Sequence, residues 1–327
     1  RLNSPRINAA SLKRKTVKVS KIQIDQLLAF SCFSNSNFNS EKKDLLIAFR
    51  RLKAFFPNGK IPSDIYFINS SFSASVFCTE KDIAIGIERY LGADEKVIQE
   101  LESKPMIFHQ IERVLESRSI DAVYVLTSTD SSDDIFCEIL LGAGIKVFRG
   151  NLLNVNERFL EFLANNSDCE VFIRLTADCP LSCSDIIDRS VEILKEKNLD
   201  YVSNTLFPTF PDGMDVEVVR RDAFLVSKKS HLTKYQQEHV TPFIYQNPQK
   251  FKLGNIVNVA NLSKFRCTVD TKDDFLAIVE LLKLNPGLSA DSKFSTLESA
   301  ICSPSNPLQV TEPRKAITQG PWMDYSF

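Results

Sequence analysis

Strand-like and helix-like segments alternate from residue 82 to residue 203, and this alternation constrains the fold more than any other feature. Residues 122–126 are continuously apolar, which is typical of a strand buried on both faces. Residues 105–116 instead place apolar side chains on one helical face. The expected strands are 83–87, 122–126, 145–148, 171–175 and 201–203, and the expected helices are 105–116, 133–141, 155–164 and 185–197. This order predicts an α/β fold with a mostly parallel sheet and helices on both faces.

Composition and the spacing of apolar residues divide the chain into three zones. Residues 1–80 form an N-terminal extension to which the sequence assigns no role. Its start is basic, with no acidic side chain before Asp25, which fits a targeting peptide as well as a solvated arm. Residues 82–285 carry the regular alternation. Residues 286–327 form a C-terminal tail whose prolines, set among Ser and Thr, predict loose packing or disorder.

Composition excludes several classes of function. The chain has 40 basic and 41 acidic side chains, whereas nucleic-acid binders usually carry a basic excess. No apolar run approaches the roughly 20 residues of a membrane-spanning helix, so we expect a soluble, cytoplasmic protein without a membrane partner. Eight cysteines lack the paired spacing of a zinc site. Free, largely buried thiols in a reducing compartment are therefore expected.

One acidic residue stands directly after an expected strand. Asp178 follows residues 171–175 and precedes Pro180. Parallel sheets bind ligands at the carboxyl ends of their strands, so this carboxylate is placed to act in a site. Mg²⁺ is usually held by one or two carboxylates together with substrate phosphates. The spacing alone is equally compatible with an Asp that caps the next turn.

Two further stretches carry clustered carboxylates. Residues 210–218 contain an Asp-Gly turn followed by Asp215 and Glu217 on one face of an expected strand, which suits sugar hydroxyls, a metal ion or a plain hairpin. In residues 266–275, Thr271 is the expected cap of a helix whose first turn is acidic. That local structure explains Asp273 and Asp274, but it does not explain Asp270.

These stretches together resemble the cytidylyltransferase family of spore-coat polysaccharide biosynthesis F proteins, acylneuraminate cytidylyltransferases and CMP-Kdo synthetases. The likeness is greatest to the spore-coat branch, whose motifs include I-T-A-D-C-P-L, Y-V-S-N-T and Y-P-D-G-L-D-V-E-V. Seven stretches match in the same order. They are K-P-M (104–106), V-F-R-G (147–150), I-R-L-T-A-D-C-P-L (173–181), Y-V-S-N-T (201–205), F-P-D-G-M-D-V-E-V (210–218), E-H-V-T-P-F (238–243) and V-D-T-K-D-D (269–274).

The resemblance implies a Rossmann-like nucleotidyltransferase fold and transfer of CMP from CTP to an acidic sugar for surface polysaccharide. By analogy, Asp178 and Asp270 would hold Mg²⁺, and Arg174 would clamp a phosphate or carboxylate beside them. Residues expected to face the sugar are Asn204, Asp212, Asp215, Glu217 and, with an ordinary helix histidine as the equal alternative, His239. CTP and an acidic sugar are the implied partners, and a homodimer is compatible with them.

The nucleotide loop is where this sequence departs from the family. The family pattern reads Q-A-R-M-G-S-T-R-L-P-G-K, whereas residues 87–96 read I-E-R-Y-L-G-A-D-E-K. Asp94 and Glu95 bring negative charge to the expected position of the triphosphate. The remaining nucleotide-binding candidates are Arg89, Gly92, Lys96, Lys104 and Arg149. Two alternatives therefore stay open: a catalytically degraded relative that binds a nucleotide, sugar or partner, and a glycosyltransferase or NDP-sugar pyrophosphorylase of related fold.

Overall fold

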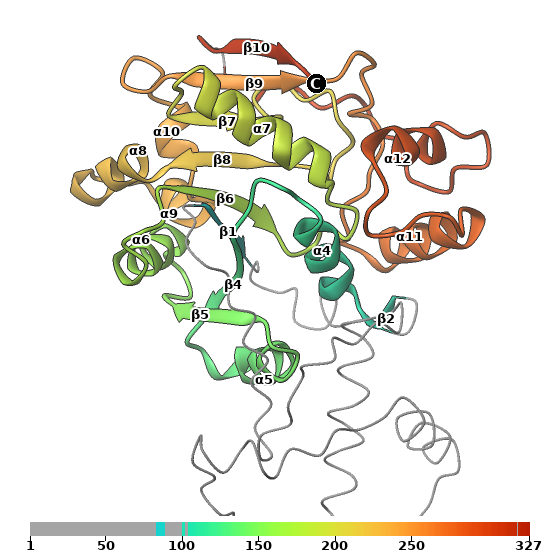
Figure 1. Ribbon diagram of the computed structural model, residues 1–327, viewed down its shortest axis with the longest axis horizontal. Helices are drawn as coiled ribbons and strands as arrows, with labels where there is room; N and C mark the ends of the chain where they lie inside the picture. Colours follow the sequence, from blue (N-terminus) through green and yellow to red (C-terminus); the bar gives the residue numbers. More distant parts are fainter. Residues whose placement is uncertain (1–82, 89–99, 102–103, 319) are drawn as a thin grey trace, which may run out of the picture. The chain divides into compact units, whose positions relative to one another are not determined.

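The computed structural model describes residues 83–88, 100–101, 104–318 and 320–327. Its strands are β1 Ile83–Glu88, β2 Glu100–Leu101, β3 Lys104–Pro105, β4 Ala122–Ser128, β5 Lys146–Gly150, β6 Val171–Thr176, β7 Tyr201–Ser203, β8 Glu217–Arg220, β9 Leu253–Val257 and β10 Met323–Ser326. Its α-helices are α4 Met106–Leu115, α5 Asp134–Gly142, α6 Val155–Asn165, α7 Ser184–Glu196, α8 Arg221–Leu225, α9 Lys234–His239, α10 Pro242–Tyr245, α11 Lys272–Leu284 and α12 Phe294–Ile301 (Figure 1). All nine elements predicted from the alternation are present. The N-terminal extension and the nucleotide loop lie outside the described residues.

The chain divides into two compact units. Residues 135–146 of the described chain fall in one unit, and they include most of α5. The described residues within 78–134 and 147–327 form the other unit, which carries the candidate site. In the described part of the chain, no helix is long and apolar enough to cross a membrane.

An eight-stranded sheet in the order β10-β9-β7-β8-β6-β1-β4-β5 organises the larger unit. Strand β1 pairs in parallel with β4 and β6, and β9 pairs in parallel with β7 and β10. Strand β8 is antiparallel to both of its neighbours, β6 and β7. The mostly parallel sheet is confirmed, and the reversed β8 has a consequence for the site. It brings the start of β8 beside the carboxyl ends of β6 and β7.

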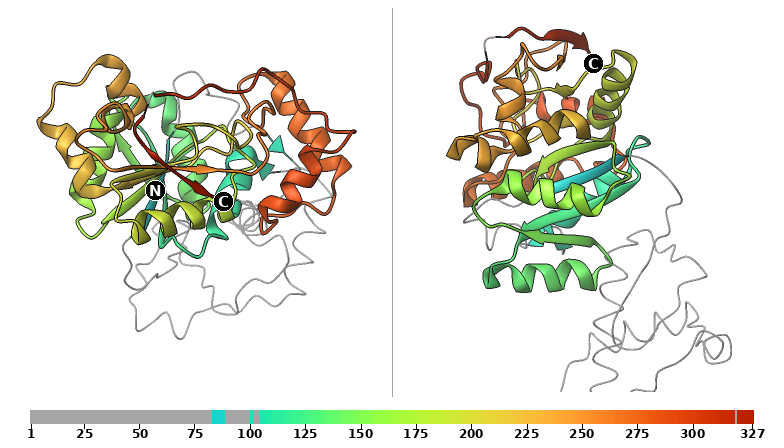
Figure 2. Two further views of the ribbon diagram at one scale, coloured as in Figure 1. Left: turned by 90° about the horizontal axis from the view of Figure 1, so that it is seen from above. Right: turned by 90° about the vertical axis from the view of Figure 1, so that its left-hand side faces the viewer.

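Helices pack on both faces of this sheet. On one face, Phe172, Tyr201 and Val219 belong to a buried aromatic and aliphatic cluster with residues of α6, α8 and α10. The register places these three residues opposite one another on β6, β7 and β8, which explains their shared face. Helix α7 lies on the other face, in front of β7 in Figure 1 and on the side opposite α10 in Figure 2. Helices on both faces, as predicted, leave the strand ends for ligands.

The predicted loose packing of the C-terminal tail is wrong. Helix α12 buries Phe294, Leu297 and Ile301, whose spacing is helical, and β10 extends the sheet alongside β9. Trp322 packs against the buried aromatic cluster. The tail prolines stand in the connections around these elements, so a Pro-rich composition concealed short segments with enough apolar surface to pack.

The turn before β8 approaches another part of the backbone closely. The Asp212 N–H donates to the Phe265 carbonyl at 2.9 Å, and the Cys267 N–H donates to the Asp212 carbonyl at 2.6 Å. Gly213 has φ +94°, and a Cβ added there would lie 2.4 Å from the Thr268 nitrogen. The turn therefore requires glycine, both for its left-handed backbone and for the space.

Replacing Gly213 with Ala should destabilise the protein by at least about 2 kcal/mol, because strain and a collision with fixed backbone add. Gly287→Ala is the matched control, since nothing lies within 4 Å of a Cβ at that position. Urea unfolding followed by circular dichroism measures both variants. Equal midpoints for the two variants would show that the close approach at residue 213 is absent in solution.

Candidate active site

A cavity of about 260 Å³ lies at the carboxyl ends of β6 and β7. Two arginines, two carboxylates, a histidine and two tyrosines contribute to its wall. Its lining consists of Arg174, Leu175, Thr176, Thr205, Asp215, Glu217, Tyr235, His239, Thr241, Tyr245, Arg314 and Ile317. Four of the predicted site residues therefore meet here: Arg174, Asp215, Glu217 and His239.

A buried ion pair forms the floor of the cavity. Arg174 of β6 lies opposite Glu217 of β8 in the antiparallel register, and their side chains form a salt bridge. Glu217 also accepts hydrogen bonds from the hydroxyls of Tyr201, at 2.6 Å, and Thr241. Both charged residues are buried, so each would be costly without its partner. Glu217 thus holds Arg174 in place at the cavity wall.

His239 of α9 lies against the ring of Tyr235, with their centroids 4.3 Å apart. Burial lowers the pKa of His239 below its ordinary value, and the charge of Arg174 acts in the same direction against the nearby acids Glu238 and Glu217. The imidazole is therefore neutral near pH 7 and able to donate or accept a hydrogen bond at the cavity wall.

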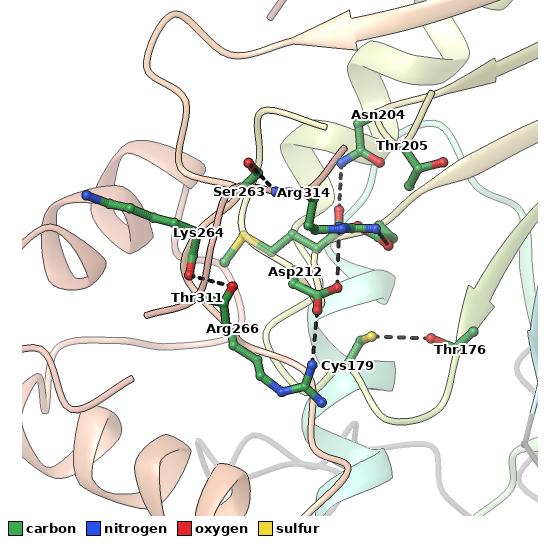
Figure 3. Close-up of polar contacts among 12 residues, drawn as sticks. Thr176, Cys179, Asn204, Thr205, Asp212, Ser263, Lys264, Arg266, Thr311 and Arg314 are labelled. Carbon is green, nitrogen blue, oxygen red and sulfur yellow. Dashed lines mark hydrogen bonds and ion pairs between the residues drawn. The ribbon is translucent and has the colours of Figure 1, made fainter. Parts of the chain in front are cut away.

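Asp215 faces an arginine that the sequence interpretation did not include. Arg314, in the C-terminal tail, binds both carboxylate oxygens of Asp215 at 2.7 Å. It also reaches Asp212, 3.3 Å away, and Asp212 in turn contacts Arg266 at 3.3 Å (Figure 3). Burial raises the pKa of Asp212, with Asp215 and Asp178 adding to the rise and the two arginines opposing it. Asp178, Asp212 and Asp215 therefore form one electrostatic group.

The two proposed metal ligands belong to neighbouring chain segments. The Val269 N–H donates to the Asp178 carbonyl at 2.9 Å, so Asp270 is one residue beyond a direct contact with Asp178. Asp178 is half-buried, whereas Asp270 is exposed and forms a salt bridge with Arg266. Neither residue is part of the cavity lining. The lining residue nearest to Asp178 in the sequence is Thr176, two positions before it. That their carboxylates lie within about 6 Å of each other stays a prediction.

The donor chemistry at this point suits a hard cation. Carboxylates contribute oxygen ligands, and Mg²⁺ needs only one or two of them when phosphates supply the rest. Within the described residues no group of three or more His, Cys, Asp or Glu side chains could enclose a metal alone. The described cysteines are free and mostly buried, as predicted. The site thus fits a metal shared with a substrate rather than a closed structural metal.

Three residues predicted to face a ligand have partners within the protein. The amide of Asn204 accepts from the Val216 N–H at 2.9 Å and donates to the Met214 carbonyl at 2.8 Å, so it fixes the backbone on both sides of Asp215. Arg149 donates to the Ser128 and Asp130 carbonyls and pairs with Asp134. Lys104 pairs with Glu112 of α4. Asn204 is buried, and both ends of its amide bond the backbone; that it also faces the sugar stays a prediction.

Sequence reasoning missed the two arginines that neutralise this group. Arg266 stands at the start of the stretch that contains Asp270, but its three carboxylate partners, at positions 212, 270 and 274, became evident only from the fold. Arg314 lies in the tail, which showed no periodic pattern to mark it. Asp274 is accounted for by local structure, as predicted, since it forms a capping box with Thr271.

Comparison with known proteins agrees with this architecture. The family model for cytidylyltransferase matches residues 92–298. A model for the gliding motility protein GldB matches residues 11–131. Among solved structures, a cytidylyltransferase from Leptospira borgpetersenii superposes with a TM-score of 0.65 at 26% identity, covering 70% of this chain and 98% of that chain.

Three curated relatives extend the comparison. An uncharacterized protein of Methanocaldococcus jannaschii is 35% identical, covering 58% of this chain and 76% of the relative. The spore coat polysaccharide biosynthesis protein SpsF of Bacillus subtilis is 27% identical, covering 66% and 94%. An N-acylneuraminate cytidylyltransferase of Streptococcus agalactiae is 26% identical, covering 58% of this chain and 49% of the relative. Because the family model spans more than half of the sequence, this chain belongs to the cytidylyltransferase family of nucleotidyltransferase enzymes.

Proposed function

We propose that this enzyme transfers CMP from CTP to an acidic sugar in the cytosol, for the synthesis of a surface polysaccharide. The observation that carries the sugar assignment is the cavity, whose lining includes Arg174 and Arg314. Arg174 suits an anionic acceptor, since a guanidinium offers a planar fork of donors to a carboxylate, while Arg314 already binds Asp215. The name of the Streptococcus relative supports an acidic sugar, and the name of the Bacillus relative supports a role in polysaccharide biosynthesis.

The size of the cavity fits one sugar unit. Pockets that enclose drug-sized ligands usually measure about 300–1,000 Å³, and this one measures about 260 Å³. The nucleotide would therefore lie outside it, toward Asp178. The nucleotide-binding candidates Arg89, Gly92 and Lys96 follow β1 in the sequence and lie outside the described residues.

In the proposed reaction the sugar hydroxyl oxygen forms a bond to the α-phosphorus of CTP. The bond between that phosphorus and the oxygen bridging to the β-phosphate breaks, pyrophosphate leaves with the bonding electrons, and the hydroxyl proton passes to water. The chain's task is to align these groups and to balance charge, which contributes most of the rate in phosphoryl transfer. Asp215 and the neutral His239 line the sugar cavity and can orient hydroxyl groups there by hydrogen bonding.

Asp178 and Asp270 are the proposed ligands of Mg²⁺. When bound there, Mg²⁺ would neutralise the triphosphate and polarise the α-phosphoryl group. Asp178, Asp212, Asp215 and Asp270 outnumber the arginines Arg266 and Arg314 that pair with this group, which leaves a negative excess for a cation to balance.

The proposed activity predicts pyrophosphate release that requires CTP, Mg²⁺ and an acidic sugar. Suitable acceptors are N-acetylneuraminate and 3-deoxy-manno-octulosonate, each compared with its neutral methyl ester. We expect release with at least one free acid, a drop of about 10-fold or more with its ester, and none with ATP in place of CTP. Calorimetric titration with CTP alone gives an independent measure of nucleotide binding. Detectable CTP binding without release from any acid would exclude this acceptor class, and no binding would favour a degraded relative.

A single substitution tests the metal assignment. Asp178→Asn keeps the size of the side chain but removes its charge, so we expect kcat for pyrophosphate release to fall about 100-fold or more. The fold should persist, because the contact to Val269 uses the backbone carbonyl of residue 178. Asp273→Asn is the control, since Asp273 is exposed in the first turn of α11. Equal rates for the two variants would remove Asp178 from the metal site.

A further inference from the structure

The C-terminal segment 308–327, which we call the strap, runs along the candidate site. Its first part is held by the segment that leads to Asp270. The Arg266 N–H donates to the Gln309 carbonyl at 3.0 Å, and the Thr311 N–H donates to the Lys264 carbonyl at 2.8 Å. Figure 3 shows Thr311 beside Lys264. An isolated antiparallel bridge joins Phe265 to Val310 between these contacts. The strap therefore enters the site in a fixed register.

The second part of the strap is anchored on the sheet. The Ile317 N–H donates to the Leu206 carbonyl at 3.1 Å, and β10 then pairs in parallel with β9. The ring of Phe327 packs edge-on against Phe210 and Phe294, with centroids 5.3 and 5.2 Å apart. Anchors on both sides of residues 312–316 restrict where the side chains between them can reach.

Arg314 stands between the two anchors and points into the site. Its N–H donates to the Ser263 hydroxyl at 3.2 Å, and its guanidinium binds Asp215 through two parallel contacts of 2.7 Å. Arg314, Asp215 and Ile317 all line the 260 Å³ cavity. The strap thus contributes both a charged and an apolar side chain to the wall of the cavity.

The Arg314–Asp215 contact has the geometry of an orienting pair. A bidentate arginine fixes the plane of a carboxylate as well as its position. Burial alone would lower the pKa of Arg314, but the charge and hydrogen bonds of Asp215 outweigh it, so this pKa is raised. Arg314 therefore stays charged across the physiological range, and its two contacts hold the carboxylate of Asp215 in one orientation.

We propose that the strap is a working part of the acceptor pocket and that Arg314 is a positioning residue, which orients Asp215 toward the sugar. The acceptor pocket is then complete only with a segment beyond residue 298, where the family match ends. This inference rests on the proposed function, because Asp215 must contact the sugar for its orientation to matter. The competing interpretation is that Arg314 only ties the strap to the domain.

Kinetics of the full chain separate these interpretations. We compare Arg314→Met and Arg314→Lys with Lys315→Met, which removes one positive charge from the exposed neighbouring position. The assay is pyrophosphate release with CTP, Mg²⁺ and the acid sugar of the panel above that reacts fastest. Arg314→Met should raise KM for the sugar about 10-fold or more and leave KM for CTP within about 3-fold, since misplacement of one contact group has effects of this order. Arg314→Lys should recover part of the loss, and Lys315→Met should resemble wild type.

A double-mutant cycle with Asp215→Asn tests whether Arg314 acts through Asp215. If it does, KM for the sugar in the double variant should be no higher than in whichever single variant has the higher KM. If the increases in KM for the sugar caused by the two single substitutions multiply in the double variant, the positioning role is overturned, because Arg314 would then act independently of Asp215. A lower melting temperature for Arg314→Met with unchanged KM for the sugar would establish the tether alone. If the wild type releases no pyrophosphate with any of the acids, the proposed function is rejected. If the wild type is active and substitution of Arg314 changes neither KM nor kcat, only the positioning role is rejected.

Discussion

Carboxylates and arginines alternate through the candidate site, and the rest of the site depends on this alternation. Asp215 binds Arg314, Arg314 reaches Asp212, Asp212 contacts Arg266, and Arg266 binds Asp270. Like-charged carboxylates at such separations repel one another, and partial burial strengthens the repulsion. Arg314 relieves this repulsion between two carboxylates, and Arg266 relieves it among three. The chain of contacts thereby joins the proposed sugar cavity to Asp270, one of the two proposed metal ligands.

The reversed strand β8 explains why these groups meet. In a sheet that is otherwise parallel, the carboxyl ends of the strands would be followed only by loops leading into helices. Because β8 runs antiparallel between β6 and β7, its first residue, Glu217, lies opposite both Arg174 and Ser203. The loop before it then crosses the carboxyl ends of β6 and β7, and Asn204 holds its backbone at residues 214 and 216. The loop carries Asp212 and Asp215 into the site.

Much of the fold could be predicted from local sequence patterns, whereas only part of the site could. Buried strands such as β4 and amphipathic helices such as α4 can be recognised from the spacing of apolar residues within a short stretch of sequence. The carboxylates of the site also followed turns or strand ends that the sequence indicated. Their arginine partners did not, because Arg314 is 99 positions from Asp215 and Arg266 is 54 from Asp212. Such pairings are set by topology. The tail was misjudged for the same reason, since β10 gains its stability from β9 rather than from its own sequence.

The alternating carboxylates and arginines also bear on how charge would be balanced during the proposed reaction. A guanidinium has five N–H donors, so Arg174 can keep Glu217 and still offer a donor to an anionic sugar. The carboxylates at the proposed metal site have no comparable arginine with donors to spare. Asp178 and Asp270 would face the triphosphate with negative charge, and Arg266 is already shared among three carboxylates. Among the described residues, no unshared arginine offsets the repulsion between these carboxylates and the phosphates, and an added cation would relieve it. Binding of CTP and binding of Mg²⁺ would therefore favour each other in the proposed mechanism, whereas the proposed sugar pocket is formed by the chain itself.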